Sequence, residues 1–187
     1  LFSIHLPGAN AVGQNGCLAA VDPGFLSMDL VLDPDLNCQN AEIQQALDYW
    51  RAIRGLRTMP ALDDMDVLQI PRNVLAHITL VDIEYEPKMR FRWRLIGTAV
   101  TTILQRDMTG RYWDEIYSED VFNLFAEPTN YVLQNRKPMR FTAKAHVADR
   151  EFYDAEHIYM PLSGPDSRIE RMLGVSAFTY SSENGED

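Results

Sequence analysis

The sequence is short of several residue types and patterns, and each shortage excludes a class of protein. Only two of the 187 residues are cysteines, Cys17 and Cys38, which is too few for a disulfide framework. No apolar run approaches the roughly 20 residues that a membrane-spanning helix needs. No basic segment precedes an apolar stretch near the start, as it would in a secretory signal. We therefore expect a cytoplasmic protein.

Positive charge is also scarce. Asp and Glu number 27 against 17 Lys and Arg, so the formal net charge is -10 at pH 7. A strongly acidic chain offers no counter-charge to nucleic acid or to an anionic membrane surface. Neither is an expected partner.

Catalytic motifs are missing as well. The sequence has no Gly-Lys-Ser/Thr phosphate loop, no Gly-x-Ser-x-Gly elbow, no His-Glu-x-x-His and no zinc-ligand spacing. The carboxylates Asp63, Asp64 and Asp66 lie in a polar stretch with no apolar wall to shift a pKa, which is typical of a solvated acidic turn. We do not expect an enzyme.

The first 39 residues contain no Lys or Arg, several Pro and Gly, and no hydrophobic period. They predict an extension that is poorly ordered, or that packs on a partner subunit through Phe25, Leu26, Met28 and Leu30. The expected domain covers residues 40–180, and residues 181–187 form an acidic, frayed tail.

An amphipathic helix is expected between Asn40, a good N-cap, and Gly55, which suits the position just past a helix end. Its apolar face must be buried, either on the sheet of its own chain or on a second copy of the chain. The second option predicts a homodimer. The candidate dimer interface consists of Ile43, Leu47, Trp50 and Ile53.

The stretch 89–116 begins as a strand. Apolar residues alternate with arginines, which places them on opposite faces of a sheet; the two sets are Phe91, Trp93 and Leu95 against Arg90, Arg92 and Arg94. For Arg90 and Arg92 we favour pairing with Glu84 and Glu86 across the hairpin over binding of an anionic ligand. Arg94 lies near Gly97, where a ligand could approach closely, so both interpretations stay open for it.

The remaining elements complete an α+β pattern. A β-branched strand at 78–85 precedes the arginine strand, and short helical runs cover 100–104 and 112–116. A longer helix follows Ser118, and three strands end the chain at 139–147, 155–162 and 171–180. The order ββ-α-βββ predicts an antiparallel sheet with helices on one face, leaving the other face for the N-terminal helix or a partner.

Two histidines invite a metal-binding interpretation. If the loop is symmetric about Glu151 and Phe152, His146 faces His157 across two strands. A tetrahedral site needs three or four ligands, and no third is evident. We expect two solvent-facing histidines and no metal.

The element order resembles the PAS domain, and more narrowly a PAS-type family widespread in alphaproteobacteria. The resemblance covers residues 40 to 180. The residues that carry it are Tyr49-Trp50, Arg54-Gly55, Pro60, Ile78 to Asp82, Phe91-Arg92, Arg94 to Thr98, Met108 to Arg111 and Pro161-Leu162. It implies a five-stranded antiparallel sheet and a sensing or protein-interaction module that commonly dimerises through an N-terminal helix.

The resemblance also bears on cofactors. In haem-bearing PAS domains the axial His usually lies on the helix that here reads 110–116, which has no His, so haem is disfavoured. Covalent flavin photochemistry needs a reactive Cys in the helical middle, and no Cys follows Cys38. Any bound ligand would be small and apolar or amphipathic, or the interior is simply packed. The candidate pocket residues are Trp93, Arg94, Thr98, Tyr112, Trp113 and Phe141.

These observations predict a regulatory or signalling module without an output domain of its own. It would sense a small ligand or mediate protein–protein interaction, as a homodimer with a protein partner. The competing hypothesis is a small-molecule-binding enzyme that uses the cavity between sheet and helices. A purely structural role would apply if Trp93, Trp113 and Phe141 filled that cavity.

Overall fold

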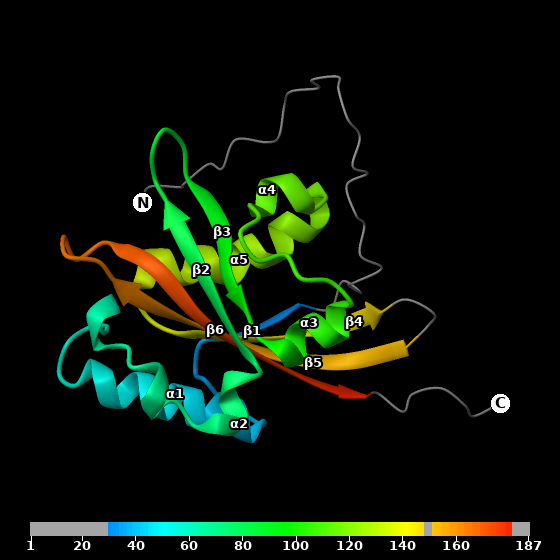
Figure 1. Ribbon diagram of the computed structural model, residues 1–187, viewed down its shortest axis with the longest axis horizontal. Helices are drawn as coiled ribbons and strands as arrows, with labels where there is room; N and C mark the ends of the chain where they lie inside the picture. Colours follow the sequence, from blue (N-terminus) through cyan, green and yellow to red (C-terminus); the bar gives the residue numbers. More distant parts are fainter. Residues whose placement is uncertain (1–29, 148–150, 181–187) are drawn as a thin grey trace.

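The computed structural model describes residues 30–147 and 151–180 (Figure 1). Within these residues, six strands form one antiparallel sheet in the order β1-β4-β5-β6-β2-β3. The strands are β1 (Val31–Asp33), β2 (Ile78–Glu84), β3 (Arg90–Ile96), β4 (Met139–Val147), β5 (Glu151–Ser163) and β6 (Ile169–Tyr180). The expected α+β class is confirmed, with six strands in place of five.

The extra strand, β1, comes from the stretch in which no secondary structure was expected. It pairs with residues 140–142 of β4, and the Asp33 carboxylate accepts a hydrogen bond from Arg140 at 3.0 Å. Three residues are too few to show a hydrophobic period, so only the pairing reveals the strand. Most of the expected extension, including Phe25, Leu26 and Met28, lies outside the described residues, as does the acidic tail.

The helices begin and end at the expected signals. They are α1 (Ala41–Arg54), α2 (Arg72–Leu75), α3 (Thr98–Leu104), α4 (Trp113–Ile116) and α5 (Glu119–Asn135), with short 3-10 turns at Leu62–Asp64 and Val67–Gln69. The Asn40 side chain accepts hydrogen bonds from the backbone N–H groups of Glu42 and Ile43, and Gly55 follows α1 with a φ of 57°. The Ser118 hydroxyl caps α5 by accepting from Val121.

The helices cover both faces of the sheet. On the inner face, Trp93 of β3 contacts the rings of Trp113 in α4 and Phe125 in α5. On the outer face, the Glu156 carboxylate of β5 accepts hydrogen bonds from the backbone N–H groups of Gln39 and Asn40, where α1 begins. Figure 1 shows the strands between α1 and the pair α4 and α5.

The apolar face of α1 is buried against the chain's own sheet. Ile43, Leu47 and Trp50 are at most 1% exposed, and Ile53 is half-buried. The indole N–H of Trp50 donates a hydrogen bond to the Pro161 carbonyl of β5 at 2.9 Å. These three side chains therefore pack on the sheet of their own chain, and not on a second copy of the chain.

The predicted pairing of His146 with His157 is wrong. Strands β4 and β5 pair Val147 with Glu151, which places His157 opposite Phe141 and His146 opposite Phe152. In this register Val147 pairs with Glu151, whereas a loop symmetric about Glu151 and Phe152 would place residue 151 within the loop. His157 is also only 5% exposed, because β5 is a central strand with both faces covered.

Candidate functional site

An aromatic layer fills the space between the inner face of the sheet and helices α4 and α5. The Trp113 ring lies 5.2 Å from Trp93, 4.9 Å from Phe91 and 5.6 Å from Phe125, measured between centroids. These are ordinary contact distances for tilted aromatic pairs in a protein core. Trp113 is fully buried.

The segment before α4 holds this layer in place. Gly110 has a φ of 84°, a conformation that favours glycine, and its N–H donates to the Trp93 carbonyl. The Trp93 N–H donates to the Arg111 carbonyl at 3.0 Å. The chain thus pairs with the free edge of β3 at one point and then carries Trp113 beneath the inner face.

The inner face also contains buried polar groups. The indole N–H of Trp93 donates to the Tyr117 hydroxyl at 3.0 Å, and burial raises the pKa of Tyr117 above its ordinary range. Burial likewise raises the pKa of Tyr159. Two fully buried atoms, Thr79 Oγ1 and Trp113 Nε1, have no hydrogen-bond partner among the described residues.

His157 belongs to a second aromatic group on the inner face, over β4 to β6. Its ring stacks on Phe141 at 4.8 Å and meets Phe178 edge-on, while its Nδ1 lies 2.8 Å from the Ser176 hydroxyl in a hydrogen bond. Burial lowers the pKa of His157 to about 4, so the imidazole is neutral at pH 7. The alternation of the strand predicts a solvent-facing histidine. That prediction is wrong for His157, because both faces of β5 are buried.

The six candidate pocket residues do not form one group. Trp93, Trp113 and Phe141 are buried on the inner face. Arg94 is exposed on the outer face, and Thr98 is exposed at the start of α3. Tyr112 is half-buried away from the interior, where its hydroxyl donates to the Glu84 carboxylate at 3.0 Å.

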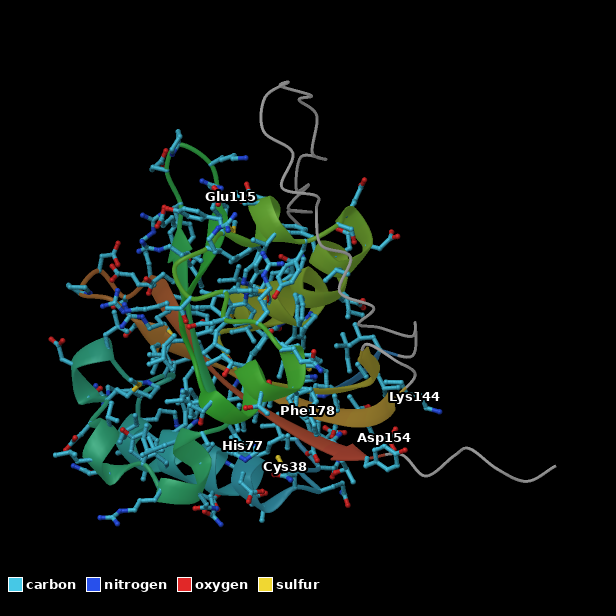
Figure 2. The ribbon with its side chains drawn as sticks, turned by 45° about the vertical axis from the view of Figure 1, so that its right-hand side comes forward. Cys38, His77, Glu115, Lys144, Asp154 and Phe178 are labelled. Atoms are coloured by element: carbon cyan, nitrogen blue, oxygen red, sulfur yellow. The ribbon has the colours of Figure 1, made fainter. Side chains whose placement is uncertain are left out.

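A connected set of charged side chains, here called the arginine network, runs from the outer face of β2 and β3 around the free edge of β3 to the start of α4. Its members are joined to one another by ion pairs and one Tyr112-mediated link. They are Lys88, Arg90, Arg92, Arg94, Arg111, Arg171, Asp82, Glu84, Asp114 and Glu115. In Figure 2, Glu115 lies at the opposite end of the molecule from Lys144 and Asp154.

Asp82 is the centre of one half of this network. Its carboxylate, 8% exposed for the residue, lies 2.7 Å from Arg171, 3.1 Å from Arg92 and 3.5 Å from Arg94. The three guanidinium groups come from β6 and β3, the two strands that flank β2. Arg92 also lies 3.5 Å from Glu84, as expected across the hairpin.

Arg90 is the centre of the other half. It donates to Asp114 and Glu115 at 2.6 and 2.8 Å, in place of the expected pairing with Glu84 or Glu86, and its guanidinium lies 3.7 Å above the Tyr112 ring. Burial alone would raise the pKa of Asp114, but hydrogen bonds from Arg90 and Lys88 bring it below its ordinary value. Sequence spacing could not reveal these partners, because they lie 24 residues away in the chain.

Two further classes of site were sought in the described part of the chain. No group of three or more His, Cys, Asp or Glu side chains is placed there to hold a metal ion. Among its helices, none has the length and apolar character to cross a membrane.

An antiparallel sheet with helices in the order ββ-α-βββ after a lead helix defines an α+β domain of PAS type. The chain is a member of the PAS domain family, since the family profile described as PAS domain matches residues 38–177. No curated protein matches the chain. PAS domains are in general sensory and regulatory modules, which gives the broad class of function.

Proposed function

We propose that the chain is a regulatory PAS module that acts mainly by binding another protein. The observation that carries this proposal is the contrast between the two faces of β3. On the inner face, Trp93 and Trp113 pack ring against ring, as in a filled core. On the outer face, Arg92 and Arg94 are held at the surface by Asp82. A preorganised charged surface suits recognition of a macromolecule.

A covalent crosslinking experiment tests the proposal. The purified protein would be crosslinked in lysate, and the crosslinked peptides mapped by mass spectrometry. We expect one partner whose crosslinks concentrate on the outer surface and whose binding is reproduced with purified proteins by calorimetry. If no candidate binds when purified, the protein-interaction proposal is wrong.

A second candidate function, sensing of a small ligand, is favoured by the unpartnered Thr79 Oγ1 and Trp113 Nε1 on the inner face. Such buried atoms call for a water molecule or a ligand group. The ligand would be largely apolar and uncharged, because the surrounding side chains are aromatic or aliphatic. Native mass spectrometry of protein purified without additives is the test. A retained mass that Thr79→Val reduces supports sensing, and a bare chain contradicts it.

The proposal includes a homodimer. Ile43, Leu47 and Trp50 are covered within the single chain, so Trp50→Glu would damage the fold along with any dimer. A second copy would instead meet Ile53 together with the exposed side of α1, which includes Ala52. Light scattering at micromolar concentration should give a dimer mass that Ala52→Glu lowers. A monomer mass for the unchanged chain would contradict the dimer.

We further propose that the chain has no catalytic activity of its own. Arg94 and Tyr112 would be the nominated residues of an enzyme that uses the interior, and both lie outside the inner face. Turnover of any substrate that depends on Arg94 or Tyr112 would contradict this.

A further inference from the structure

The arginine network has more positive than negative groups. Six cationic side chains, from Lys88, Arg90, Arg92, Arg94, Arg111 and Arg171, face four carboxylates. The whole chain, by contrast, has a net charge of -10. A local excess of positive charge on an acidic protein attracts anionic groups to that one place.

Arg94 is the least tightly held of the three arginines around Asp82. Its side chain is 52% exposed, and its ion pair is to the Asp82 oxygen that also accepts from Arg92. At 3.5 Å this contact is looser than those of Arg92 and Arg171 with the same carboxylate. Three guanidinium groups around one carboxylate leave N–H groups without an acceptor. The Nε of Arg92, a buried atom, also has no hydrogen-bond partner among the described residues.

The supporting side chains hold the network in position. Arg90 is fixed by Asp114 and by the Tyr112 ring, and Tyr112 in turn binds Glu84 beside Arg92. Asp82 lies in the middle of β2 with β3 on one side and β6 on the other. Because these groups are already ordered, binding an anion would cost little conformational entropy.

The spacing of Arg92 and Arg94, which bind the same carboxylate, specifies the shape of the anion. Arg92 and Arg94 lie two residues apart at an irregularity in the β2–β3 pairing, and both guanidinium groups reach the same Asp82 oxygen. In regular strand geometry a two-residue separation is roughly 6.6 Å. In an extended peptide, acidic residues at alternate positions have the same spacing. Guanidinium groups bind carboxylates in pairs of parallel hydrogen bonds.

We propose that the outer surface at Arg92, Arg94 and Arg171 binds an extended acidic segment of a partner protein, with carboxylates at alternate positions. This inference rests on the protein-interaction function proposed above and names the surface and the chemistry of the partner. Figure 1 shows the β2–β3 hairpin extending away from α1. The Arg94 side chain is 52% exposed, so a partner can reach it.

Fluorescence anisotropy with a defined probe tests this inference. The probe is a labelled peptide of four Ser-Glu repeats, measured at low salt with the full chain. We expect Arg94→Gln to weaken its binding at least fivefold. Arg72→Gln, which removes an exposed arginine from α2, is the matched control and should leave affinity within twofold. A peptide with the same glutamates in one block should bind more weakly than the alternating peptide.

Four outcomes would overturn the inference. The first is no binding of the probe to the unchanged chain, and the second is an equal loss in the Arg72 and Arg94 variants. The third is full competition by millimolar inorganic phosphate with no effect of glutamate spacing, which would make this a site for a single anion. The fourth is loss of a dimer in Arg94→Gln without peptide binding, which would make the occupant a second copy. None of these results would contradict a partner protein that crosslinks to another part of the surface. The proposed protein-interaction function would then still stand.

Discussion

The outer face of the sheet has two parts that use opposite chemistry. Between Glu156 of β5 and Arg171 of β6, it is apolar and covered by α1, through Ile43, Leu47 and Trp50. Over β2 and β3, it carries Arg92 and Arg94 and stays open. The covered part stabilises the fold, because burial of apolar area dominates folding free energy. Exposed ion pairs contribute little to stability, so the open part is free to serve recognition.

The largest expected effect comes from the covered part. Trp50→Ala should lower the free energy of unfolding by about 3–5 kcal/mol, since it leaves a cavity and an unpaired Pro161 carbonyl. Denaturant titration measures this. Leu56→Ala is the control, because Leu56 is fully exposed and should change stability by less than about 0.5 kcal/mol. If both variants changed the free energy of unfolding equally, the surface covered by α1 would not be the part that stabilises the fold.

The second prediction concerns the centre of the open part. Asp82→Asn should cost about 2 kcal/mol, because three guanidinium groups lose the carboxylate that neutralises them. Glu86→Gln, on the exposed turn after β2, should stay within about 0.5 kcal/mol. An effect of Asp82→Asn as small as that of Glu86→Gln would show that the network is only a solvated surface.

The third prediction tests the inner face. A Cβ added at Gly174 would lie 2.3 Å from Thr79 Oγ1, so Gly174→Ala should destabilise by about 1–2 kcal/mol. The double variant Gly174→Ala/Thr79→Ala should recover part of that loss, as thermal unfolding would show. Equal stability of the single and double variants would mean that the Thr79 hydroxyl is not the obstacle.

The smallest effect is a pH dependence from His157. Its folded pKa, about 4, is below the ordinary value of 6.5, so between these values the unfolded chain binds more protons. Stability from the neutral imidazole is therefore full above pH 6.5 and is lost as pH falls toward 4. Between pH 7 and 6 the loss should be about 0.7 kcal/mol. His157→Gln should lack this component, and equal pH slopes in both proteins would contradict it.

Much of the fold could be predicted where the signal is local. The caps at Asn40 and Ser118 depend on backbone N–H groups two or three residues away, and both formed as expected. The alternation of β3 correctly separated Trp93 from Arg92. The predictions that failed concerned contacts between residues far apart in the sequence. The turn between β4 and β5 fixed the partner of His157, and no local pattern reports a turn centre.

The candidate pocket residues also include some that were correctly predicted and some that were not. Trp93, Trp113 and Phe141 were correctly expected in the interior, because large aromatic side chains are buried wherever the chain allows. Arg94 and Tyr112 were grouped with them from neighbouring positions in sequence. Strand alternation and the turn at Gly110 place both on the other side of β3.

By itself, the sequence determined most of the elements and their order, and it separated Trp93 from Arg92 on β3, because these features follow from periods of 2 and 3.6 residues and from end caps. Only the tertiary structure decided which elements meet. It turned the apolar face of α1 onto its own sheet, added β1 to an edge and gathered arginines from β3 and β6 around Asp82. Such contacts depend on strand pairing between distant segments, which no local pattern encodes.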